Sequence, residues 1–137
     1  MKSRINVIIY ILYTLILLIL SFNYDFINNI NLAISNNFEN YNLIYNILKY
    51  VEVIIIYIGY GICTTLFCID VFNEIKYIVI YSILLSVLIV IIDLVVKSYI
   101  GDYQIYIFIS SIICVIIGVV IQLLVKVNQV KGDKYEK

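Results

Sequence analysis

Four long apolar segments dominate the chain, and none shows the alternation of apolar and polar positions expected of an element at the surface of a soluble protein. They cover residues 5–22, 50–69, 77–96 and 106–125. A helix needs about 20 apolar residues to cross the hydrocarbon core of a bilayer, which is about 30 Å thick. Each segment meets or nearly meets that length. The pattern predicts an all-α integral membrane bundle of four transmembrane helices.

Composition supports the same fold class. Of the 137 residues, 64% are hydrophobic and 13% are charged, whereas a soluble domain is about 45–50% apolar and about 25% charged. A soluble fold of this size buries only about two-thirds of its surface, so lipid must cover the remainder. The sequence contains no proline, and no linker divides it. We therefore expect a single membrane domain over residues 1–137.

The first apolar segment could also be read as a cleaved signal peptide, because Lys2 and Arg4 precede it. However, it is longer than the apolar region of a typical signal peptide, about 7–15 residues. The residues that follow it, 21–26, offer no small-residue cleavage site. We expect an uncleaved first span.

Basic residues predict the orientation, because short loops rich in Lys and Arg stay in the cytoplasm. Lys2 and Arg4 precede the first span. Four more basic residues follow the fourth span: Lys126, Lys131, Lys134 and Lys137. With both termini inside, Lys76 is also inside, and only Lys49 and Lys97 are outside, a ratio of seven to two. Ile, Asn, Tyr and Lys are abundant, which is typical of proteins encoded by AT-rich bacterial DNA. We expect a multi-pass protein of the bacterial cell membrane with both termini cytoplasmic (N-in/C-in).

The first outer segment, residues 23–48, contains no basic residue. It carries a stripe of apolar and aromatic residues at helical spacing. The members of this stripe are Phe38, Tyr41, Tyr45 and Leu48. Two interpretations remain open: a short helix lying on the outer membrane interface, or an irregular polar loop.

Carboxylates interrupt two of the spans near their outer ends. A charge at the centre of a membrane helix costs about 2.5–3.5 kcal/mol on insertion scales, so such residues suggest function. Glu52 has Lys49 three residues before it, and Asp93 has Lys97 four residues after it, while Asp102 lies in the next outer turn. These groups form either two ion pairs at helix ends or one polar pocket that opens outward. In the second case, the candidate binding residues are Lys49, Glu52, Asp93, Lys97 and Asp102.

Small residues recur at about one-turn intervals in two spans. They are Gly59, Gly61, Cys63 and Thr64 in the second and Ser110, Ser111, Cys114 and Gly118 in the fourth. Small side chains let membrane helices approach closely. We expect these two faces to pack against other helices rather than to line a pore.

Several kinds of chemistry are missing from the sequence. It has no histidine, which excludes His-based acid–base catalysis and the common zinc sites. Its three cysteines, Cys63, Cys68 and Cys114, lack the C-x-x-C spacing and should be free thiols within the spans. No phosphate-binding glycine motif is present. The formal net charge of zero indicates no nucleic-acid partner. We expect no cofactor, and the pattern favours a protein that is not an enzyme.

The layout resembles the VanZ-like family of small bacterial membrane proteins, whose name comes from a protein associated with teicoplanin resistance. The first span ends with a Leu-Ser pair before an outer loop, as in that family. In the second span Tyr57 and Gly61 keep the family spacing, and at the end of the third Asp93 and Gly101 do so.

The chain departs from the family at most other polar positions. Val53 stands at the family's His, Leu94 at its Glu, Lys97 at its Gln and Asp102 at its Arg. Of the positions that match, only Asp93 carries chemistry. The resemblance implies an envelope protein linked to glycopeptide resistance or to the handling of lipids or cell-wall precursors at the outer face.

Two other functions are compatible with the sequence. The small-residue faces would also suit an accessory subunit of a larger membrane complex, with other membrane proteins or further copies of the chain as partners besides the lipid bilayer. A transporter or pore ranks below both, because the central turns of all four spans are almost wholly apolar.

Overall fold

The computed structural model describes residues 2–100 and 104–135, and these residues form helices joined by short turns. The helices are α1 (Lys2–Phe22), α2 (Tyr24–Ser35), α3 (Tyr41–Val71), α4 (Ile75–Ile100) and α5 (Ile105–Tyr135). No strand occurs in the described part of the chain. The prediction of an all-α fold is confirmed.

Four of the five helices, α1, α3, α4 and α5, are long and apolar enough to cross a membrane, as the hydrophobic pattern predicted. The chain therefore has the helices of a multi-pass membrane protein. Both α3 and α5 contain 31 residues, which makes each about 46 Å long at about 1.5 Å per residue. They exceed the hydrocarbon core of a bilayer, so their ends extend past the spans expected from hydropathy.

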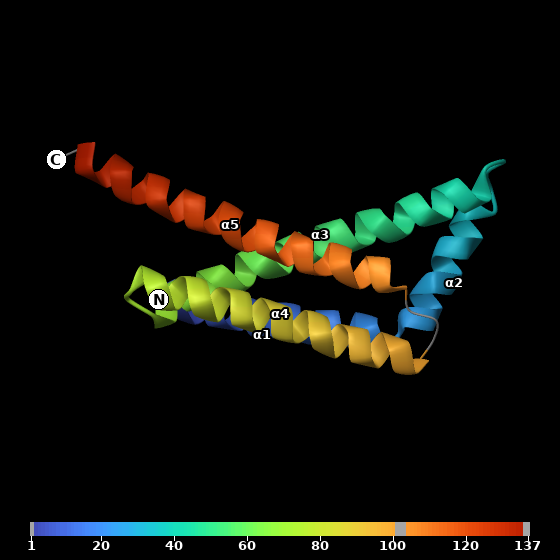
Figure 1. Cartoon of the computed structure of the whole chain (residues 1–137), viewed down its shortest axis with the longest axis horizontal. Helices are drawn as coiled ribbons and strands as arrows, with labels where there is room; N and C mark the ends of the chain where they lie inside the picture. The colour runs from blue at the N-terminus through green and yellow to red at the C-terminus, as the bar shows by residue number, and fades with distance from the viewer. Residues whose placement is uncertain (1, 101–103, 136–137) are drawn as a thin grey trace.

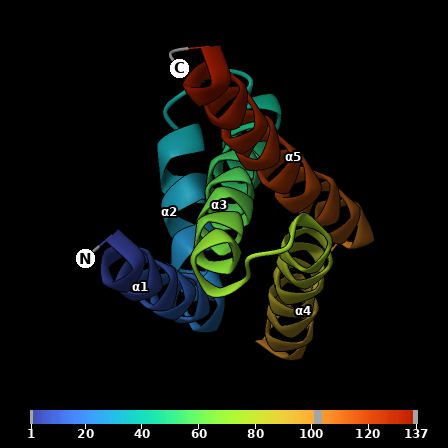
Figure 2. The same cartoon turned by 90° about the vertical axis from the view of Figure 1, so that its left-hand side faces the viewer.

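Helix α3 is the centre of the bundle and contacts every other helix. Figure 1 shows α1 and α4 running alongside each other, while α3 and α5 cross. The view along the bundle in Figure 2 shows α3 between α1 and α5. Helix α2 connects the end of α1 to the start of α3 and also contacts α4. We call the end of the bundle that holds α2 and the C-terminus of α4 the α2 end.

The segment between the first two spans contains a short helix, but at a different place from the one expected. The helix is α2, over Tyr24–Ser35, whereas Tyr41, Tyr45 and Leu48 already belong to α3 and Phe38 lies in the intervening turn. Asparagines at 36, 37 and 40 favour that turn, since their side chains compete for backbone hydrogen bonds. From Tyr41 onward neither Gly nor Pro ends the helix before Gly59, so α3 begins earlier than hydropathy indicates.

The crossing of α3 and α5 depends on two glycines that face each other. A Cβ atom built on Gly61 would overlap the carbonyl oxygen of Val115 and lie 3.1 Å from the Cα of Gly118. A Cβ on Gly118 would overlap the carbonyl oxygen of Ile58 in the same way. Backbone touches backbone here, which gives the dispersion contacts that drive helix association in lipid. The expected packing role of these glycines is confirmed.

A third glycine makes room for a side chain of α1. A Cβ on Gly59 would lie 2.5 Å from the hydroxyl of Tyr13. That hydroxyl donates a hydrogen bond to the carbonyl oxygen of Ile56, at 2.7 Å. Next to it, the hydroxyls of Thr14 and Tyr60 lie 3.2 Å apart. The interface of α1 with α3 is therefore held by polar contacts as well as by aromatic packing.

We predict that Gly61→Ala destabilises the protein by about 1–3 kcal/mol, the usual cost of an overpacked site. The atoms that the new methyl group meets belong to the backbone of α5, so the two helices must separate. Gly132→Ala is the matched control, because nothing lies within 4 Å of a Cβ at that exposed position of α5; it should leave stability unchanged or raise it by up to about 1 kcal/mol. Unfolding in mixed micelles measures both variants, and equal stabilities would contradict the close approach.

Candidate functional site

The site is built around Asp93, near the C-terminal end of α4, whose side chain is completely buried. An isolated carboxylate among apolar side chains is unstable unless it is paired and hydrogen-bonded. Its partners come from three helices. Ser21 at the end of α1 donates to one carboxylate oxygen, and Tyr57 in the middle of α3 donates to the other. The ammonium group of Lys97, one turn later on α4, lies 3.1 Å from the oxygen that Tyr57 contacts.

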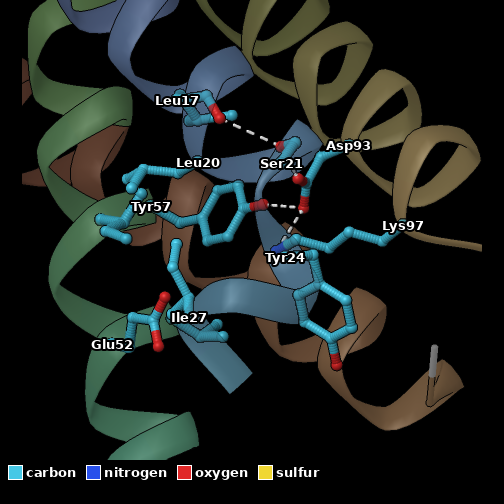
Figure 3. A pocket seen from close by; sticks show the side chains of 11 residues that line it. Leu17, Leu20, Ser21, Tyr24, Ile27, Glu52, Tyr57, Asp93 and Lys97 are labelled. Carbon is cyan, nitrogen blue, oxygen red and sulfur yellow. Dashed lines mark hydrogen bonds and ion pairs between the residues drawn. The ribbon is translucent and has the colours of Figure 1, made fainter. Parts of the chain in front are cut away.

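Each partner is placed by its helix. Asp93 and Lys97 are four residues apart with the acid first, the favourable order for an ion pair on a helix. Tyr57 is itself buried, with 2% of its surface exposed. Ser21 occupies the last turn of α1, where its hydroxyl also lies 3.0 Å from the carbonyl oxygen of Leu17. Figure 3 shows these side chains converging on Asp93.

A small cavity adjoins this cluster, with a volume of about 20 Å³. That is room for about one water molecule. Its polar lining consists of Ser21, Tyr24, Glu52, Tyr57, Asp93 and Lys97. The carboxylate of Glu52, which is half-buried, accepts a hydrogen bond from the Asn31 side chain at 3.2 Å. In Figure 3, Tyr57 lies between Glu52 and Asp93.

Tyr24, the first residue of α2, lies against the cationic side of the site. Its ring centre is 5.3 Å from the Lys97 ammonium and 5.8 Å from that of Lys49, within the range of a cation–π attraction. Burial raises the pKa of the Tyr24 phenol, and the nearby carboxylates of Glu52, Asp25 and Asp93 raise it further. The phenol is therefore neutral at physiological pH.

Of the five candidate binding residues, Glu52, Asp93 and Lys97 line the same cavity. Asp102 lies outside the described residues. The predicted pair of Asp93 with Lys97 is present. It does not merely cap a helix end, because Ser21 and Tyr57 bring α1 and α3 to the same carboxylate.

The ion pair of Lys49 with Glu52, which belonged to the first of the two interpretations left open, is absent: the two charges are not within 4.0 Å of each other in the described structure. The Lys49 ammonium instead lies over the rings of Tyr24 and Tyr45, 5.8 and 5.6 Å from their centres. A lysine that precedes its acid by three residues has the less favourable order for a helical pair. The aromatic faces supplied by α2 and by the next turn of α3 compete successfully for the cation.

Four polar members of the site are not among the candidates that the sequence offers: Ser21, Tyr24, Asn31 and Tyr57. Ser21 and Tyr57 enter the sequence argument only through the family resemblance, and Tyr24 and Asn31 fall in a segment without a clear hydrophobic pattern. The useful signal is the serine in the last turn of an apolar span, since a buried hydroxyl in lipid needs a partner. Nothing in the sequence specified which partner it would find.

The cysteines and carboxylates outside the site stand apart from one another in the described part of the chain. The three cysteines are unpaired, as expected, with Cys68 and Cys114 buried and Cys63 half-buried. Among the residues that the structure describes, no group of three His, Cys, Asp or Glu side chains could hold a metal ion. The carboxylate of Asp93 is buried and both of its oxygens have partners within the protein.

Comparison of the chain with protein-family models, with curated proteins and with solved structures finds no match.

We predict that Tyr57→Phe destabilises the protein by about 1.5–3 kcal/mol, the range for a hydrogen bond to a charged group. The same change at Tyr99, whose side chain is 93% exposed, is the control and should have no measurable effect. In an Asp93→Asn background Tyr57→Phe should cost about half as much, because a neutral acceptor forms the weaker bond. Unfolding in mixed micelles measures the native protein and the four variants, and an unchanged cost in the Asn background would mean that the carboxylate is not the acceptor.

Proposed function

We propose that this chain is a VanZ-like protein of the bacterial cell envelope. In this proposal both termini are cytoplasmic and the α2 end faces outward. The site at Asp93 then lies in the outer leaflet and binds an amine-bearing polar group of a lipid or cell-wall precursor. The protein thereby alters the response of the cell to glycopeptides such as teicoplanin.

The observation that carries this proposal is the convergence of three helices on the buried carboxylate of Asp93. Two of the positions that keep the family spacing, Tyr57 and Asp93, are in direct contact through a hydrogen bond. A third, Gly61, allows the close crossing of α3 and α5. These positions thus have definite structural roles in this chain, which supports the likeness in layout.

Glu52 supplies the chemistry for a ligand. Asp93 is neutralised by Lys97 and has hydrogen bonds to both of its oxygens, so it shapes the site without offering a free charge. Glu52 lines the same cavity and accepts a bond from the neutral amide of Asn31. A carboxylate in this half-buried position favours a primary ammonium group, because charge-assisted hydrogen bonds strengthen where water is scarce.

The orientation is tested by labelling with a membrane-impermeant maleimide. Glu39→Cys, in the exposed turn between α2 and α3, should react in intact cells. Lys131→Cys, near the end of α5, should react only after the membrane is made permeable. The unsubstituted protein gives the background of its own three cysteines. Labelling of Lys131→Cys but not of Glu39→Cys in intact cells would reverse the proposed orientation.

The function is tested by expressing the protein in a glycopeptide-susceptible host. Native protein should change the inhibitory concentration of teicoplanin, and Glu52→Gln should lose most of that change. The Gln side chain keeps an oxygen for Asn31, so the fold should persist. Glu39→Gln removes a charge from the exposed turn at the same end and is the matched control. No change with native protein confirmed in the membrane would contradict the proposal, and equal activity of the two variants would remove Glu52 from it.

The accessory-subunit alternative now has less to support it. Its motivation was the small-residue faces of two spans, and Gly61 and Gly118 of those faces pack against each other within this chain. Purification in mild detergent still separates the two functions, since an accessory subunit should retain a stoichiometric partner.

A further inference from the structure

A second hollow lies at the opposite end of the bundle from Asp93, between the start of α4 and the last third of α5. In Figure 1 the C-terminal part of α5 diverges from the start of α4. The groove between them has a volume of about 260 Å³, more than ten times that of the cavity beside Asp93. We call it the α4–α5 groove.

The groove combines an apolar floor with a basic rim. Ile78 of α4 is fully buried at its base, and Leu123 and Val130 of α5 line its wall. The lining also includes three lysines of α5: Lys126, Lys131 and Lys134. Lys126 is half-buried and the other two are exposed. None of the three forms an ion pair with any residue that the structure describes.

All of the α5 residues in this lining share one face of the helix. At about 100° per residue, positions from Leu123 to Lys134 that line the groove fall within an arc of about 140°. Asn128 and Gly132 lie on the opposite face, outside the groove. The lysines are thus directed to the same side as the apolar residues, so one ligand can contact both the charged and the apolar groups.

The depth of the groove matches the boundary of a bilayer. The apolar run of α5 ends at Val125, and Lys126 is the next residue. Leu123 lies about 4–5 Å deeper along the helix than Lys126. The floor is therefore at the level of acyl chains, and the rim at the level of headgroups.

We propose that the α4–α5 groove binds one anionic phospholipid, with an acyl chain against Ile78 and Leu123 and the phosphate group between Lys126, Lys131 and Lys134. Basic pockets between membrane helices bind anionic headgroups by this combination of charge and apolar contact. The proposal is independent of the function at Asp93 and of the orientation of the chain, since the groove lies in whichever leaflet holds the C-terminus.

A second copy of the chain is the less suitable occupant. Pairing through this groove would bring two sets of three lysines together, and like charges destabilise such a contact. The acidic groups closest in sequence are Glu74, just before α4, and Asp133, near the end of α5; both are exposed and neither lines the groove. The lining itself carries positive charge alone.

The chain contains no tryptophan, so one introduced Trp reports on its surroundings without background. Leu123→Trp places the probe at the floor of the groove, at the level of the acyl chains. Val125→Trp places it on the opposite face of the same helix at nearly the same depth. Each protein is reconstituted in vesicles of phosphatidylcholine with a minor fraction of brominated phosphatidylglycerol, or of brominated phosphatidylcholine. Bromine on the acyl chains of a lipid quenches the fluorescence of a Trp side chain that the lipid contacts.

The Leu123→Trp protein should show a preference for phosphatidylglycerol of about tenfold or more, at about fivefold per lysine near the lipid surface. The preference should fall below about twofold when Lys126, Lys131 and Lys134 are all changed to Gln. It should persist with three Arg and weaken in high salt. Val125→Trp should show no such preference.

Equal quenching by the two brominated lipids at Leu123→Trp would overturn the proposal. An equal preference at Leu123→Trp and Val125→Trp would also overturn it, because general attraction to an anionic surface would then suffice. If the triple Gln variant fails to fold, as judged by its helical circular dichroism, the Arg variant and the salt dependence decide between the outcomes.

Discussion

The cost of a carboxylate in an apolar bundle is the constraint on which much of this structure depends. Asp93 is completely buried, and an unpaired charge there would oppose folding by several kcal/mol. Hydrogen bonds from α1 and α3 and an ion pair within α4 together offset that cost. Hydrophobic attraction cannot position helices against one another in lipid, since lipid tails are equally apolar. The polar contacts at Asp93 supply the specificity that apolar surfaces lack.

The α3–α5 crossing also lacks a hydrophobic driving force in lipid, and close backbone contact takes its place. At Gly61 and Gly118 the two backbones approach until a single methyl group would not fit. Dispersion forces fall off steeply with distance, so this closeness is the source of the attraction. Helix α3 thus contacts α4 and α1 at the buried charge of Asp93. It contacts α5 at two glycines, where no side chain separates the backbones. Both contacts lie along one helix, at Tyr57 and Gly61, one turn apart.

The two ends of the bundle differ in what they offer to a ligand. Near α2, acidic and basic groups are gathered around a cavity large enough for one water molecule, and the charge left for a ligand is that of Glu52. At the other end, a wider groove has an apolar floor and a rim of lysines. We propose an amine as the ligand at the first end and an anionic lipid at the second. A membrane protein with both features can hold its lipid environment at one surface while a polar ligand binds at the other.

The sequence by itself determined the fold class, the four apolar spans and the presence of charges at one end of the bundle. Composition and the length of each apolar run suffice for this, because the bilayer imposes a fixed thickness. The pair of Asp93 with Lys97 was also predictable, since both residues lie on one helix at a fixed spacing. The orientation of the chain in the membrane stays a prediction from its charges.

Only the tertiary structure decided which groups meet across helices. Ser21 and Tyr57 are 72 and 36 residues from Asp93 in sequence, and no local pattern links them. The pairing of Lys49 with Glu52 failed for the same reason, because the ring of Tyr24 comes from α2, a helix whose position was not predicted. Spacing along one helix fixes contacts within that helix, whereas contacts between helices depend on how each is rotated and packed. In an apolar bundle, that rotation is set by a few polar and small residues, of which Asp93 and Gly61 are the clearest.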